Sequence, residues 1–200
     1  MLNRTEAARW LTVAWMTVAL MTAGMLMLSG RACAESDMLP SATGPRVAKA
    51  LLLDAARAGD RIVSVGERGI VLYSDDEGGT WAQGKAPVDV TLTGVTFADA
   101  QHGWATGHDA VIIATDGGVT WALQHAEPEL DVPLLGLAFE SPTTGFAVGG
   151  RGNLFYTTDG GKTWANQVIL TRDEFDSHLF GISKSLTGSY FLASEQGVLY

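Results

Sequence analysis

Cysteine is almost absent from this chain of 200 residues, because Cys33 is the only one. A single cysteine cannot form a disulfide within the chain. It also falls in an N-terminal segment that we expect to be removed. The mature protein then has no covalent cross-link, and its stability must come from a packed core.

Positive charge is also scarce. The chain has 13 Lys and Arg against 22 Asp and Glu, which gives a formal net charge of −9 at pH 7. One of these acidic residues and three of the basic ones precede Glu35, so the rest of the chain carries −11. Such an acidic protein repels a phosphate backbone, which argues against nucleic acid as a partner.

Histidine is the third scarce residue type, with four in the chain. They are His102, His108, His125 and His178, and no two of them have the close spacing of metal ligands. We expect no bound metal and no cofactor.

The N-terminus has the layout of a secretory signal peptide. Arg4 and Arg9 precede an uncharged, mostly apolar stretch from Trp10 to Ser29, and Ala32-Cys33-Ala34 is a small-x-small cleavage site. We expect residues 1–34 to be a signal peptide, residues 35–50 to be a polar tether, and the protein to be exported to the periplasm or secreted. Because the apolar stretch is long, an uncleaved membrane anchor is the alternative.

One short phrase occurs three times in the chain. It spans residues 74–81, 114–121 and 157–164, and it reads Ser/Thr/Ala-x-Asp-x-Gly-x-Thr-Trp. The tryptophans Trp81, Trp121 and Trp164 lie 40 and then 43 residues apart. Self-similarity at this period is typical of a repeat architecture.

Each copy of the phrase lies between two short apolar runs, which predicts a turn joining two antiparallel strands. The Asp accepts hydrogen bonds from backbone N–H groups of its own turn, the glycines supply positive φ angles, and the Trp covers the turn. We interpret these residues as structural rather than catalytic. They are Asp76, Gly78, Thr80 and Trp81, then Asp116, Gly118, Thr120 and Trp121, then Asp159, Gly161, Thr163 and Trp164.

Superposing the repeats gives four short strands per unit of roughly 40 residues, which predicts the blade of a β-propeller. The expected blades cover about residues 51–84, 91–125, 133–168 and 178–200, and the last one has no copy of the phrase. The predicted fold is therefore all-β, an incomplete propeller with three blades and most of a fourth. We expect a longer protein of which this is the N-terminal part; closure between chains is the alternative. Aromatic residues at equivalent inner positions should pack between blades; they are Phe97, Trp104, Phe139, Phe146, Phe155 and Phe180.

The repeated phrase resembles the Asp-box, also called the bacterial neuraminidase repeat. In such a blade the hairpin between the second and third strands lies at the end opposite the Asp-box. Binding residues favour loops on a rigid scaffold, so this hairpin end is the candidate binding face. It carries Arg68, His108, Asp109, Arg151 and Gln196. Arg68 and Arg151 offer forked donors to a carboxylate or an acidic partner, although solvated turn residues are the simpler reading.

The Gly-x-Arg-Gly hairpins at residues 66–69 and 149–152, each followed by an apolar strand and an Asp-box, resemble the photosystem II stability/assembly factor family. The resemblance covers about residues 51–200 and implies a non-catalytic propeller that binds an assembly intermediate of a membrane protein, partly through a basic face. Asp109 and Gln196 replace arginine in two hairpins, so that face is incomplete here. We expect a non-photosynthetic bacterial member whose partner is a membrane protein complex or a transporter subunit.

Two other functions share the same scaffold. A sialidase-like glycoside hydrolase needs an arginine cluster, a Tyr nucleophile assisted by Glu, and a further acid. Only six arginines follow the signal segment, and Arg61-Ile62-Val63 lacks the proline of the family's Arg-Ile-Pro motif. We therefore do not expect an enzyme. A carbohydrate-binding or adhesion module is the other alternative, which the sequence does not separate from an assembly factor.

Overall fold

The computed structural model describes residues 39–41, 47, 49–169, 177–197 and 199. The predicted signal peptide, Cys33 and most of the tether lie outside this range. All the described residues belong to one compact unit, Ser36–Tyr200. No helix within the described range is both long and apolar enough to span a bilayer.

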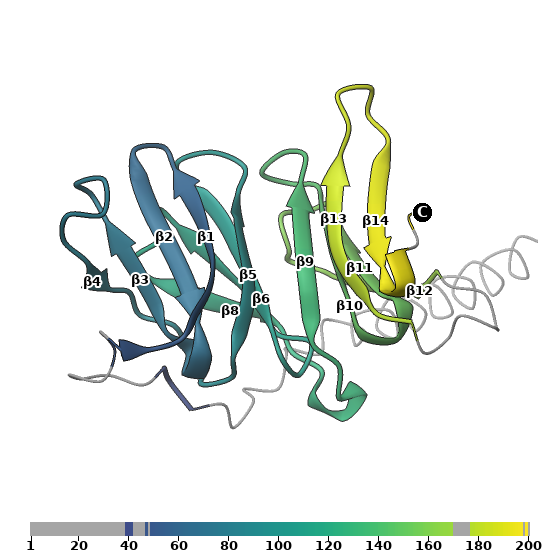
Figure 1. Cartoon of the computed structure of the whole chain (residues 1–200), viewed down its shortest axis with the longest axis horizontal. Coiled ribbons are helices and arrows are strands. Elements are labelled where there is room, and N and C mark those ends of the chain that lie inside the picture. Colours follow the sequence, from purple (N-terminus) through teal and green to yellow (C-terminus); the bar gives the residue numbers. More distant parts are fainter. Residues whose placement is uncertain (1–38, 42–46, 48, 170–176, 198, 200) are drawn as a thin grey trace, which may run out of the picture. The chain divides into compact units, whose positions relative to one another are not determined.

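The described chain is all-β, with three four-stranded antiparallel sheets and one two-stranded sheet in sequence order (Figure 1). The first sheet contains β1 (Leu52–Ala58), β2 (Arg61–Gly66), β3 (Val71–Ser74) and β4 (Ala82–Gln83). The second contains β5 (Leu92–Phe97), β6 (His102–Gly107), β7 (Ile112–Asp116) and β8 (Trp121–His125). The third contains β9 (Leu134–Phe139), β10 (Gly145–Gly149), β11 (Asn153–Thr157) and β12 (Ala165–Val168), and the two-stranded sheet contains β13 (Leu179–Lys184) and β14 (Tyr190–Ser194).

Each sheet is a propeller blade whose strands follow one another by hairpins. The first strands of successive blades, β1, β5, β9 and β13, lie next to one another (Figure 1). The blades form an arc that does not close, so the prediction of an incomplete all-β propeller is confirmed. The segment 48–58, whose apolar spacing also fits a helix, forms strand β1 over the residues from Leu52 onward.

The core consists of three clusters, each between neighbouring blades. Alternate side chains of a strand point to opposite faces of its sheet, so one strand serves two clusters. In the third blade, Phe155 belongs to the cluster shared with the second blade, whereas Leu154 packs toward β13 and β14. Trp104 of the second blade stacks on Phe139 of the third, with ring centroids 3.5 Å apart. Phe180 does not follow the prediction of a packed aromatic, because 52% of it is exposed on β13.

The first and third Asp-boxes share one hydrogen-bond pattern. In the third box, Asp159 accepts from the backbone N–H of Thr163 at 3.0 Å, from the Thr163 hydroxyl at 2.6 Å and from the Thr157 hydroxyl at 2.8 Å. Asp76 accepts the corresponding bonds from Thr80 and Ser74. These donors favour the ionised carboxylate, so they lower the pKa of both aspartates to about 2.

The second Asp-box departs from this pattern. The β6–β7 pairing makes Thr115, not Ala114, the equivalent of Ser74 and Thr157, and its hydroxyl accepts the Gly118 N–H at 2.9 Å. The turn from this hydroxyl to the box tryptophan is thus one residue shorter than in the other two boxes. Asp116 therefore sits beside the turn, opposite His102 on β6, and accepts none of the bonds that hold Asp76 and Asp159. The expectation that all three aspartates brace their turns does not extend to Asp116.

This difference predicts how acid affects stability. The folded pKa of Asp159, about 2, lies below its ordinary value of 3.8, so its ionised form stabilises the fold above about pH 4. That contribution disappears as the pH falls toward 2. Asp159→Asn should lower the melting temperature by several degrees at pH 6 and have little effect at pH 2, whereas Asp116→Asn should have little effect at either pH. Thermal unfolding followed by circular dichroism measures this, and equal effects of the two variants at pH 6 would contradict it.

Candidate functional site

The three hairpins between the second and third strands share one backbone structure. Each begins with a glycine that ends the second strand: Gly66, Gly107 and Gly149. The next residue donates its N–H to the carbonyl oxygen of the residue just before its blade's first strand. These bonds are Glu67 to Leu51 at 3.0 Å, His108 to Thr91 at 3.0 Å and Gly150 to Pro133 at 2.9 Å.

Close approach of the backbone requires these glycines. A Cβ atom at Gly66 would lie 2.0 Å from the Leu51 oxygen, and one at Gly149 would lie 2.1 Å from the Pro133 oxygen. Two hairpins are also tied to the segment leading into the next blade, because Gly69 N–H bonds to Val90 O at 2.7 Å and Ala110 N–H to Val132 O at 2.9 Å. The backbone of the first two hairpins is therefore held by two neighbouring blades.

The central residue of each hairpin has a left-handed backbone. Its φ is 56° at Arg68, 59° at Asp109 and 54° at Arg151. Asp tolerates this region well, but an arginine there costs about 1–2 kcal/mol relative to a right-handed backbone. Strained residues that persist on a rigid scaffold are concentrated at binding sites, and both arginine side chains are exposed. The two arginines thus have matching backbone conformations on equivalent hairpins.

The surroundings of the arginines are mixed in charge. Arg151 donates from Nη1 to the carbonyl oxygen of Leu130 at 3.4 Å, which places it beside the loop between β8 and β9. This loop contains a short turn, Pro128–Leu130, and the acidic residues Glu127, Glu129 and Asp131. In the first hairpin, Glu67 accepts the Leu51 N–H at 3.2 Å. The face therefore presents separate guanidinium groups among carboxylates rather than a continuous basic patch.

The other predicted residues of this face are less defined. His108 is exposed and Asp109 half-buried, in the second hairpin. Asp109 accepts the Glu127 N–H through its backbone oxygen at 2.9 Å, so its hairpin also contacts the β8–β9 loop. Gln196 lies in the short turn Glu195–Gly197 after β14, and its side chain is outside the described part of the chain. The β8–β9 loop was not predicted as part of this face; its signal in the sequence is the acidic run around Pro128.

Known proteins share this sequence and architecture. Residues 125–199 match the family model described as photosynthesis system II assembly factor YCF48. The chain is 32% identical over 114 residues to the photosystem II assembly lipoprotein Ycf48 of Synechococcus sp. (strain CC9902), which covers 53% of this chain and 32% of that protein. The predicted resemblance to the photosystem II assembly factor-like family is confirmed, whereas a non-photosynthetic bacterial origin stays a prediction. The chain is also 31% identical over 75 residues to YkuO of Bacillus subtilis (strain 168), covering 38% of this chain and 25% of that protein.

Solved structures show the same fold. The chain superposes with a TM-score of 0.59 on YCF48 bound to D1 peptide, at 21% identity, covering 80% of this chain and 51% of that one. YCF48 from Cyanidioschyzon merolae gives a TM-score of 0.60 at 23% identity, covering 76% and 53%. The computationally designed Ika4 protein gives 0.58 at 11% identity, covering 80% and 93%. At these identities the likeness concerns the fold, and the chain spans about half the length of the YCF48 structures and a third or less of the curated relatives.

Proposed function

We propose that the chain is a non-catalytic, exported binding propeller that acts as an assembly or stability factor for a membrane protein complex. Its hairpin face holds a segment of the partner polypeptide, with Arg68 and Arg151 as anchors. The observation that carries this proposal is the equivalent, strained placement of two exposed arginines on rigid hairpins. A related propeller, YCF48, has been solved with a D1 peptide bound, which supports peptide binding as the role of the scaffold.

The charge pattern indicates what kind of segment fits. A guanidinium group binds a carboxylate through two parallel hydrogen bonds, so each arginine is suited to one carboxylate of the partner. The acidic loop beside Arg151 repels further negative charge. The preferred segment therefore carries one or two carboxylates, from side chains or from its C-terminus, and is otherwise neutral or basic. The proposal applies equally to a subunit of a transporter and to a subunit of a photosynthetic complex.

The arrangement of arginines favours binding over sialoside hydrolysis. Arg57 and Arg61 are ion-paired with Glu77 and Asp75 of the first Asp-box, at the end opposite the hairpins. Among the described residues, this leaves Arg68 and Arg151 at the hairpin end, on blades that are not adjacent. Two arginines there do not form the three-arginine cluster that binds a sialic acid carboxylate.

Capture from a solubilised membrane fraction tests the proposal. We expect the immobilised protein to recover a subunit of a membrane complex, and the double variant Arg68→Gln/Arg151→Gln to reduce its affinity at least about tenfold, since anchoring arginines are typical binding hot spots. The matched control, Arg57→Gln/Lys85→Gln, changes the net charge equally and should retain binding. Equal loss in both double variants would show that only net charge matters and would contradict the hairpin face.

An activity assay separates the enzymatic alternative. We expect no cleavage of a fluorogenic sialoside by the purified protein. Turnover that is abolished by Arg151→Ala would overturn the binding-propeller proposal in favour of a glycosidase.

A further inference from the structure

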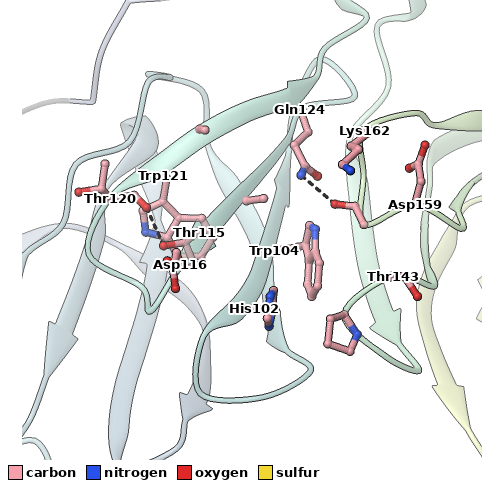
Figure 2. A pocket seen from close by; sticks show the side chains of 14 residues that line it. His102, Trp104, Thr115, Asp116, Thr120, Trp121, Gln124, Thr143, Asp159 and Lys162 are labelled. Atoms are coloured by element: carbon pink, nitrogen blue, oxygen red, sulfur yellow. Dashed lines mark hydrogen bonds between the residues drawn. The ribbon is translucent and has the colours of Figure 1, made fainter.

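A cavity of about 640 Å³ lies between the second and third blades, at the Asp-box end and away from the hairpin face. One wall comes from β6, β7 and β8 of the second blade, and the other from the β9–β10 turn and the third Asp-box (Figure 2). Asp116, His102 and Trp104 line the first wall, and Lys162 lines the second. The corresponding gap between the first and second blades is occupied by a side chain of the protein itself, Arg61. The contacts of this side chain indicate which chemical group the cavity binds.

Arg61 fills the gap between the first and second blades. Its guanidinium group pairs with Asp75 through two bonds, from Nε at 2.7 Å and from Nη2 at 2.9 Å. It donates from Nη1 to the Gly117 carbonyl oxygen of the second Asp-box at 2.6 Å, and it lies 4.7 Å from the ring centre of Tyr73. One guanidinium group thus joins the two blades.

The second blade retains the acceptors of this arrangement but not the arginine. By strand register, His102 is the equivalent of Arg61, Asp116 of Asp75 and Ala114 of Tyr73. His102 pairs instead with Asp99, with Nδ1 2.9 Å from the carboxylate oxygens. Asp116 is left exposed at the cavity, because the shorter Asp-box does not use it. A carboxylate and a free volume therefore stand where the first blade holds a guanidinium group.

Two unpaired polar atoms in the lining provide a second, independent observation. Gln124 donates to the Gly160 oxygen at 2.9 Å, as Arg61 does to Gly117, but its own Oε1 is buried without a hydrogen-bond partner among the described residues (Figure 2). The Nε1–H of Trp104, a side chain only 2% exposed, is also unpaired within that part of the chain. Buried polar groups without partners are costly, so a ligand that supplies one donor and one acceptor is favoured here.

We propose that this cavity binds a guanidinium group from an arginine side chain of a partner polypeptide. The guanidinium donates to the Asp116 carboxylate. Small side-chain shifts then bring the buried Gln124 Oε1 into contact with a further guanidinium N–H, and the buried Trp104 N–H into contact with a backbone carbonyl oxygen of the arginine. The acidic balance of the chain favours a cationic ligand, whereas the Lys162 ammonium on the opposite wall weakens its binding.

Titration of the full chain with N-acetylargininamide tests this proposal, with the indole N–H resonance of Trp104 as the NMR reporter. We expect saturable shifts that Asp116→Asn weakens about three- to tenfold, consistent with a partly exposed charged pair. The control Asp131→Asn removes one negative charge from the hairpin end and should leave the binding unchanged. Lys162→Gln should strengthen it.

His102→Arg provides a sharper test, because it restores the residue that fills the gap in the first blade. We expect this variant to lose binding of N-acetylargininamide while melting at the same temperature or higher. N-propylguanidine, which has the same single positive charge but no amide carbonyl, should bind more weakly, whereas equal binding would refute a polypeptide source. Absence of shifts in the parent protein, or full binding by His102→Arg, would overturn the site. The test does not depend on the hairpin face, since Arg68→Gln/Arg151→Gln should bind N-acetylargininamide normally.

Discussion

Replacing Gly149 with alanine is expected to destabilise the protein by about 3 kcal/mol or more. The new Cβ would lie 2.1 Å from the Pro133 oxygen and 2.7 Å from the Leu134 Cα, and neither backbone atom is free to move. Pro133 O already accepts the Gly150 N–H, and Leu134 begins strand β9. Relief of the clash must therefore separate the hairpin from the first strand of its blade and displace Arg151.

Gly181→Ala is the matched control for this change. Gly181 lies in a first strand, β13, and a Cβ there would meet no atom within 4 Å. We expect its effect to stay within about 0.5 kcal/mol. Chemical denaturation gives both free energies of unfolding. If Gly149→Ala is as stable as Gly181→Ala, the close crossing of hairpin and first strand is not a constraint in solution.

Truncation of Phe155 should have an effect of similar size. The side chain is 1% exposed and packs in the cluster between the second and third blades, 4.9 Å from the His125 ring. Phe→Ala changes in such cores cost about 3–5 kcal/mol. Because blades contact mainly their neighbours, the loss should fall on this one interface. Hydrogen exchange should therefore increase first in β7, β8 and β11, while β1 and β2 stay protected.

Tyr156→Ala is the control on the same strand. Tyr156 follows Phe155 directly, points to the other face of the sheet and is 39% exposed. Its truncation should cost clearly less and should not loosen the second blade. Uniform exchange throughout the chain after Phe155→Ala would instead indicate that the blades unfold as a single unit.

The fold was predictable because the Asp-box combines turn chemistry with a spacing that only a repeat produces. The hairpin end was also predictable as a location, since strand order determines which loops lie opposite the Asp-boxes. The left-handed backbone of Arg68 and Arg151 was not, because arginine carries no local preference for it. The available signal was the glycine that follows each arginine, Gly69 and Gly152.

The second Asp-box shows a limit of pattern matching. Aligned by the shared letters Asp-x-Gly-x-Thr-Trp, Asp116 matches Asp76 and Asp159. Strand pairing instead aligns Thr115 with Ser74 and Thr157, because register follows the cross-strand hydrogen bonds and not the turn sequence. The motif does not reveal that the turn is one residue shorter, because all of its shared residues are present. The cavity beside Asp116 was missed for the same reason.

The bonds from Gly69 to Val90 and from Ala110 to Val132 have a consequence for recognition. They fasten the first two hairpins to the segments that lead into the second and third blades, so the spacing of these hairpins follows the spacing of the blades. The protein can therefore select a partner by the spacing of its charges as well as by their sign. Adding or deleting a residue between blades would change that interval without altering any residue that touches the partner.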